Sequence, residues 1–182
     1  MNRQFLYLIG EPGIGKSTLM AQLTSTMLAI EQVSPIRHIL WLDGYQEPRF
    51  AELGARRANG FSGTDALPMG IQPRATEWIA QRPYRSILAE GDRLANDGFF
   101  AAVEAAGYKL TVVYLAGSVA AERRIQRGSR QNPAWVRGRI TKTERLAIKW
   151  GALDLIVDGK DPATLAAELV LKLGVDPGAG LG

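Results

Sequence analysis

The 182-residue sequence contains no cysteine and only one histidine, His38. The absence of cysteine excludes disulfide scaffolds, thiol catalysis, cysteine-ligated zinc and iron–sulfur clusters. With a single histidine, neither a histidine-rich metal site nor a Ser–His–Asp triad is expected. The apolar runs are far shorter than the roughly 20 residues that span a bilayer, and the N-terminus lacks a signal-peptide pattern. These absences favour a cytoplasmic protein that does not interact with membranes.

The length and composition fit one globular domain. Apolar types make up 46% of the residues and charged types 22%, which is the usual balance of a soluble protein. We expect a single domain over residues 1–174 and a flexible tail over residues 175–182, where glycine is frequent. No feature of the sequence indicates an oligomeric state.

The net charge of +4 is unevenly distributed. Between residues 123 and 149 there are nine basic residues and one acidic residue, so this segment is near +8 and the rest of the chain is near −4. A solvated helix face is one interpretation. Because Trp135 and Trp150 are interleaved with the charges, phosphate neutralisation with base stacking is another. Trp135 is then either a core residue or a stacking platform.

Short apolar segments alternate with helical patterns along the chain. We expect strands at 4–9, 38–42, 85–89, 110–115 and 153–157, and helices at 17–30, 75–80, 99–106, 119–127, 134–150 and 162–173. This alternation predicts an α/β fold, with a five-stranded parallel sheet and helices on both faces. Ligands of such sheets bind at the carboxyl ends of the strands. Four residues follow predicted strands and should meet there: Gly10, Asp43, Glu90 and Asp92.

Residues 10–17 (GEPGIGKS) match the phosphate-binding pattern G-x4-G-K-[ST] in full, between a predicted strand and a predicted helix. Glycines let the backbone wrap around a triphosphate, and the amides at the start of a helix attract anions. Lys16 can reach the β- and γ-phosphates, while Ser17 can ligate magnesium. We therefore expect ATP and Mg²⁺, with the nucleotide bound by Gly10, Gly13, Ile14, Gly15, Lys16, Ser17 and Thr18.

The motifs of switch-type GTPases are missing, because no Asp is followed three positions later by Gly, and residues 141–144 (TKTE) end in the wrong residue for the guanine motif. From its first strand to residues 153–159 (LDLIVDG), the chain resembles the P-loop kinases that act on nucleosides, nucleotides and polynucleotides. This resemblance implies a nucleotide-kinase-like fold.

The resemblance also implies roles for acidic residues. Asp43 would accept the proton of the attacking hydroxyl, although an Asp-Gly turn is the alternative. Residues 90–93 (EGDR) look like the acidic strand end of these kinases, where Asp92 or Glu90 would bind magnesium through water. Arg93 would hold the anion of the acceptor or pair with Asp92.

Basic residues complete the implied site. Arg123 and Arg127 reproduce the R-x3-R spacing of the nucleotide-kinase lid, which places both on one helix face. In that family the first arginine stacks on the ATP base and the second meets the transferring phosphate, while Arg130 would be a further lid contact. The catalytic set is then Lys16, Asp43, Arg123 and Arg127, with an Arg-rich lid over residues 123–149.

The sequence indicates the phosphoryl acceptor less directly than it indicates the nucleotide. The Gly-rich residues 60–73 suit a binding loop, in which Thr64 and Asp65 would hydrogen-bond the acceptor, with Arg49 nearby. This stretch and the basic segment 123–149 resemble bacteriophage kinases of 5-hydroxymethyluracil in DNA. That resemblance implies a base extruded from the duplex, a strand held by the basic segment, and action in the cytoplasm of a host cell. The alternatives are a kinase for a nucleoside, nucleotide or other metabolite hydroxyl, and a non-catalytic ATP-binding module.

Overall fold

The computed structural model describes residues 3–44, 48–57, 60–126, 128 and 131–173. The strands within this part are β1 (Arg3–Gly10), β2 (Leu28–Gln32), β3 (His38–Leu42), β4 (Phe50–Leu53), β5 (Ser86–Glu90), β6 (Tyr108–Ala116) and β7 (Leu153–Ile156). The helices are α1 (Lys16–Leu23), the 3-10 turn η1 (Thr64–Ala66), α2 (Gln72–Ala80), α3 (Asp97–Ala105), α4 (Val119–Gln126), α5 (Pro133–Lys149) and α6 (Pro162–Lys172). None of the described helices has the length and apolar composition of a membrane span. The expected tail, 175–182, lies outside the described residues.

The strands form one mixed sheet in the order β2-β3-β4-β5-β1-β6-β7. From β4 to β7 in this order all neighbours are parallel, whereas β3 is antiparallel to both β2 and β4. The prediction of a five-stranded parallel sheet is therefore wrong: the sheet has seven strands, and residues 38–42 belong to an antiparallel hairpin at one edge. Because β3 runs against β4, its carboxyl end lies at the edge of the sheet opposite to the carboxyl ends of β1 and β5.

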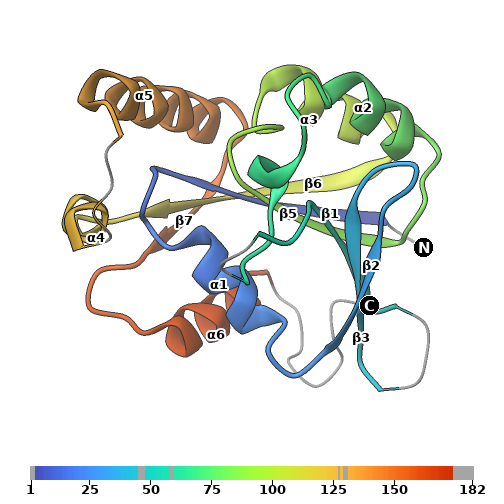
Figure 1. Cartoon of the computed structure of the whole chain (residues 1–182), viewed down its shortest axis with the longest axis horizontal. Helices are drawn as coiled ribbons and strands as arrows, with labels where there is room; N and C mark the ends of the chain where they lie inside the picture. Colours follow the sequence, from blue (N-terminus) through green and yellow to red (C-terminus); the bar gives the residue numbers. More distant parts are fainter. Residues whose placement is uncertain (1–2, 45–47, 58–59, 127, 129–130, 174–182) are drawn as a thin grey trace.

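Helices cover both faces of the sheet (Figure 1). Along β1, Phe5, Tyr7 and Ile9 point into one apolar core, and Leu6 and Leu8 point into the other, because successive side chains of a strand alternate. Helices α2, α3 and α5 close the first core, and α1 and α6 close the second. Burial on both faces explains why β1 is a continuous apolar run.

The end of one helix and the presence of two strands differ from the prediction. Helix α1 ends at Leu23, and residues 28–32 form β2 rather than more helix. The hydroxyl of Thr24 donates to the carbonyl of Met20 at 3.1 Å, and side-chain bonds of this kind compete with helix continuation. Strand β4 escapes prediction because it has only four residues and one of them, Glu52, is acidic.

Candidate functional site

The phosphate loop connects β1 to α1, where its sequence predicts it. Gly10, Gly13 and Gly15 have φ angles of 151°, 89° and 114°, a region that disfavours side chains. A Cβ atom on Gly13 would lie 2.9 Å from Cγ of Arg124, and one on Gly15 would lie 3.0 Å from an Nη atom of Arg123. Both the backbone conformation and the arginines packed on the loop therefore require glycine.

Helix α1 begins at Lys16 and directs its positive end toward the loop. Among the described residues, no side chain caps this end, so its amides suit an anionic ligand. The Lys16 ammonium group donates to the carbonyl oxygens of Gly10 and Glu11 at 2.8 and 3.1 Å. Burial lowers the pKa of Lys16. A desolvated cation held beside open helix amides is an arrangement that favours a bound phosphate.

A buried carboxylate meets the phosphate loop at the end of β5. The hydroxyl of Ser17 donates to Oε1 of Glu90 at 2.8 Å, and a guanidinium nitrogen of Arg57 donates to the same oxygen at 3.0 Å. The Glu90 side chain is 1% exposed. Its burial raises the pKa of Glu90 to about 7, although Lys16 and Arg57 oppose the rise. Of the two acidic residues considered for magnesium, Glu90 is therefore the one that contacts Ser17.

Part of the 60–73 segment packs under the site rather than into it. Thr64 is fully buried; its hydroxyl donates to the carbonyl of Glu90 at 2.9 Å and lies 3.2 Å from the hydroxyl of Tyr7. A Cβ atom on Gly63 would lie 2.1 Å from Oε1 of Glu90. Thr64 thus holds the segment against β1 and β5, and its side chain does not line the cavity.

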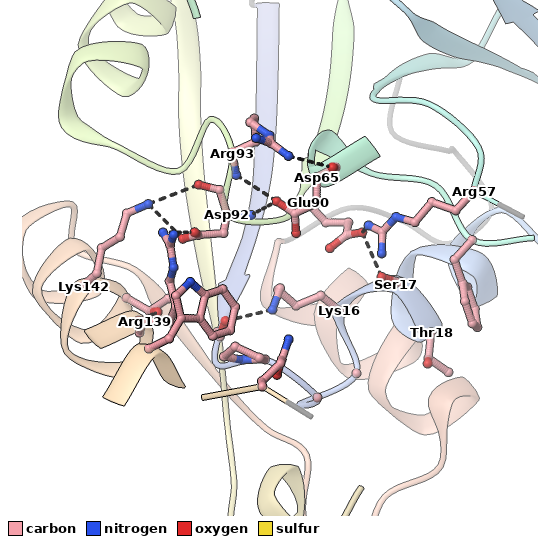
Figure 2. A pocket seen from close by; sticks show the side chains of 18 of the residues that line it. Lys16, Ser17, Thr18, Arg57, Asp65, Glu90, Asp92, Arg93, Arg139 and Lys142 are labelled. Atoms are coloured by element: carbon pink, nitrogen blue, oxygen red, sulfur yellow. Dashed lines mark hydrogen bonds and ion pairs between the residues drawn. The ribbon is translucent and has the colours of Figure 1, made fainter. Parts of the chain in front are cut away.

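A cavity of about 900 Å³ opens where these elements meet, as Figure 2 shows. Of the predicted site residues it is lined by Gly10, Gly13, Gly15, Lys16, Ser17, Thr18, Asp65, Glu90, Asp92 and Arg93. Its lining also includes other residues, among them Arg57, Phe61, Met69, Gln131, Trp135, Arg139, Lys142 and Thr143. The phosphate loop and the acidic strand end therefore share one cavity with α5.

Helix α5, which covers the face of the sheet opposite to α1, contributes two cations. The ammonium group of Lys142 donates to Oδ1 of Asp92 at 2.8 Å and to its carbonyl oxygen at 3.1 Å. Arg139 forms an ion pair with Oδ2 of the same carboxylate. Asp92 is thus held by α5, away from Ser17.

Asp65 organises the chain that follows β5. Its Oδ1 accepts the amide hydrogens of Asp92 at 2.8 Å and Arg93 at 3.0 Å. The Arg93 guanidinium donates to the carbonyl oxygen of Asp65 at 3.1 Å and contacts the sulfur of Met69. In the part of the chain that the structure describes, Arg93 forms no ion pair, so it does not pair with Asp92.

Two arginines of α4 hold the phosphate loop from outside. Arg123 donates to the carbonyl of Ile14 at 2.8 Å, so the backbone of Ile14 is engaged while its side chain is fully buried. Arg124 donates to Oε2 of Glu11 at 2.8 Å. Arg127 and Arg130, which were also predicted as lid contacts, lie outside the described residues.

A second cavity, of about 300 Å³, borders Arg123. Its lining includes Thr18, Gly15, Lys160 and Pro162. Gly15 and Thr18 also line the larger cavity. The two cavities therefore lie next to each other along the start of α1.

Asp43 and Arg49 lie away from both cavities. Asp43 follows the antiparallel β3, so it lies at the edge of the sheet opposite to Gly10 and Glu90. Its side chain is 64% exposed and pairs with Arg49 at 2.6 Å. The prediction that Asp43 shares a sheet edge with Gly10 and Glu90 is wrong. Arg49 pairs with Asp43 and lines neither cavity.

The structure places two further residues near the site whose burial or exposure the sequence does not determine. Glu52 is fully buried in β4, where it accepts from Nε1 of Trp41 at 2.9 Å and contacts the hydroxyl of Ser62; burial raises the pKa of Glu52. In the sequence, the only indication of this buried carboxyl group is an acidic residue between apolar ones.

Trp135 is 43% exposed at the cavity, with the Arg139 guanidinium 5.1 Å from its ring centre, so it is not a core residue.

The oxygens of Ser17 and Glu90 fit a magnesium ion that accompanies a nucleotide. Mg²⁺ in such sites keeps waters and phosphate oxygens as ligands and takes only one or two from the protein. The described residues contain no group of three or more His, Cys, Asp or Glu that could hold a metal on its own. The hydroxyl and the carboxylate, 2.8 Å apart, are of the required chemical type.

Comparisons with known proteins agree with a P-loop kinase fold. The family model for P-loop Nucleotide Kinase3 matches residues 1–160. Similar solved structures include a gluconokinase from Sinorhizobium meliloti 1021, with a TM-score of 0.55 and 16% identity over 94% of this chain and 91% of that one. A sugar kinase from Janibacter sp. HTCC2649 has a TM-score of 0.52 and 14% identity over 99% of both chains.

The tunicamycin resistance protein of Deinococcus radiodurans has a TM-score of 0.55 and 14% identity, over 96% of this chain and 98% of that one. At these identities the likeness establishes the fold alone. No curated protein matches the chain. These matches do not support the specific resemblance to bacteriophage DNA kinases.

Proposed function

The chain belongs to the P-loop Nucleotide Kinase3 family, and we propose that it is an ATP- and Mg²⁺-dependent kinase that phosphorylates a hydroxyl of a small molecule. The observation that carries this proposal is the larger cavity. Its floor is a phosphate loop, and it continues past Glu90 to Asp92 and α5. At about 900 Å³ it lies at the upper end of the range for small-ligand sites, which suits a triphosphate and a second substrate together.

ATP spans the two adjacent cavities in this proposal. Its base lies in the smaller one beside Arg123, whose flat guanidinium suits stacking. The triphosphate then passes Thr18 and Gly15 to reach the loop. Lys16 leaves the loop carbonyls that it now contacts and binds the phosphates instead.

Phosphoryl transfer needs positioning and charge stabilisation more than covalent catalysis. The acceptor hydroxyl oxygen attacks the γ-phosphorus as the bond to ADP breaks, and the hydroxyl proton is released to water. Lys16 and the amides at the start of α1 stabilise the charge that develops on the phosphoryl oxygens. Ser17 and Glu90 would hold the magnesium ion, which supplies further neutralisation of the phosphates when bound.

A small acceptor is favoured by two comparisons. The family is described as one of nucleotide kinases, and the similar solved structures include a gluconokinase and a sugar kinase. A second candidate acceptor is the hydroxymethyl group of 5-hydroxymethyluracil in DNA. Trp135 favours it, because an indole 43% exposed at the cavity is a platform on which an extruded base can stack.

The test uses γ-phosphate-labelled ATP with Mg²⁺ and a panel of acceptors. The panel contains thymidine, thymidine monophosphate, glucose, gluconate, and DNA with and without 5-hydroxymethyluracil. Label in a small molecule supports the proposal, whereas label in modified DNA alone establishes the second candidate. Wild-type protein that binds ATP and labels no member of the panel counts against the proposal and favours a non-catalytic ATP-binding module. Lys16→Ala is the negative control and should label nothing.

A further inference from the structure

We propose that Arg139 and Lys142 bind an anionic group of the acceptor, and that Asp92 occupies the place of that group in the free protein. This inference rests on the proposed kinase function. It names the acceptor class as a hydroxyl compound that also carries a phosphate or a carboxylate.

The first observation is that two cations share one carboxylate. Lys142 donates to Oδ1 of Asp92 at 2.8 Å, and Arg139 pairs with Oδ2. Figure 2 shows both cations directed at Asp92 from α5. One negative charge against two positive charges leaves this wall of the cavity with a positive excess. A carboxylate is already the group bound here, so the site is built for an oxyanion.

The second observation is that Arg93 adds a cation that has no carboxylate partner among the described residues. Its guanidinium is held by the carbonyl oxygen of Asp65 and the sulfur of Met69, and its Nε is buried without a hydrogen-bond partner. The carboxylate of Asp65 is engaged instead by backbone amides. A partly desolvated cation without a counter-ion is unfavourable, and an anion in this cavity relieves it.

The contact with Asp92 is suited to exchange. The side chains of Asp92, Arg139 and Lys142 are 33%, 34% and 32% exposed, so water screens their ion pairs. Helix α5 does not depend on these pairs for its position, because Leu146 and Ala147 anchor it in the core.

The contact between Arg139 and Trp135 keeps the site assembled when the carboxylate leaves. The guanidinium lies 5.1 Å from the centre of the indole ring, which orients it independently of Asp92. An acceptor anion that displaces Asp92 thus meets cations already in place. A neutral compound has no group that can displace it, so the exchange selects anionic acceptors.

The experiment compares acceptors in pairs that differ in charge: thymidine with thymidine monophosphate, and glucose with gluconate. The wild type is expected to use an anionic member at least about tenfold better in kcat/KM than its neutral partner. The two pairs separate a phosphate from a carboxylate as the bound anion. Equal use of both members of each pair overturns the inference and leaves the kinase function standing.

Variants then assign the anion to α5. Arg139→Gln and Lys142→Gln should each raise the KM of the anionic acceptor about 10- to 100-fold and change the KM of ATP less than about threefold. Arg137→Gln is the matched control, since it removes the same charge from an exposed position of the same helix and should change neither value. An unchanged acceptor KM in the Arg139 and Lys142 variants overturns the inference.

Asp92→Asn tests the exchange in the opposite direction. It removes the charge of the internal competitor, so the KM of the anionic acceptor should fall, and a rise counts against the inference. Circular dichroism confirms that each variant is folded. A folded wild type that binds ATP and phosphorylates no acceptor overturns the proposed function and this inference together, and transfer to DNA alone overturns the inference.

Discussion

Substitution of Gly63 tests whether the contact between its loop and Glu90 organises the site. Gly63 has φ 134° and ψ 171°, a combination that is almost exclusive to glycine. A Cβ atom there would lie 2.1 Å from Oε1 of Glu90 and 2.7 Å from a guanidinium nitrogen of Arg57. Both distances are far below van der Waals contact. In Gly63→Ala the Glu90 carboxylate must therefore move, and its bonds from Ser17 and Arg57 are disturbed.

Two terms set the size of the effect. Placing alanine in this backbone region costs about 1–3 kcal/mol, and losing one charged hydrogen bond to the buried Glu90 costs about 1.5–3 kcal/mol. We expect the free energy of unfolding to fall by about 3–5 kcal/mol. For a domain of this size that corresponds to a Tm lower by about 6–20 °C.

Gly60→Ala is the matched control for backbone strain alone. Gly60 lies in the same loop with φ 82°, and a Cβ atom there would meet nothing within 4 Å. It should cost about 1–2 kcal/mol. Urea unfolding followed by circular dichroism measures both variants, and calorimetry measures their affinity for ATP. Equal losses in the two variants would refute the argument that the approach of Gly63 to Glu90 organises the site.

Further outcomes follow from the placement of individual groups. Asp43→Asn should leave kcat and KM within about threefold of wild type, because an exposed pair with Arg49 away from the cavity contributes little; a tenfold loss in steady-state kinetics would contradict this. The pKa of Glu90 is raised from 4.5 to about 7 in the folded protein, so its stabilising contribution is complete below about pH 4.5 and is lost as the pH rises toward about 7, by about 3 kcal/mol. Urea unfolding across this range should show that loss in the wild type and not in Glu90→Gln, and parallel curves would count against it. The KM of a small acceptor should change less than about tenfold between about 50 and about 200 mM salt, whereas a DNA acceptor should lose about a thousandfold in affinity.

The phosphate loop was predictable from the sequence because its determinants are local. Gly10, Gly15, Lys16 and Ser17 are separated by fixed spacings, and the turn and helix start that they form depend on adjacent residues. The carboxyl ends of β1 and β5 also meet at one edge, as expected for parallel neighbours. The sequence could therefore indicate both the nucleotide-binding loop and the acidic strand end near it.

The direction of β3 was decided only by the tertiary structure. The apolar residues 38–42 have the same pattern in a parallel and an antiparallel strand, and the pairing partners that set their direction are β2 and the short β4. A strand placed in the wrong direction moves the residue after it to the other edge of the sheet. This is why the sequence pattern predicts Asp43 at the site, although Asp43 lies at the opposite edge of the sheet.

The different contacts of Glu90 and Asp92 likewise depend on how the helices pack on the sheet. Glu90 turns toward Ser17, 73 residues earlier in the chain, and Asp92 turns toward Lys142, 50 residues later. These contacts form because α1 and α5 cover opposite faces of one sheet and both reach its carboxyl edge. Local sequence patterns determine where strands and helices begin and which motif follows them. They do not determine which distant side chains meet, because that depends on how the elements pack.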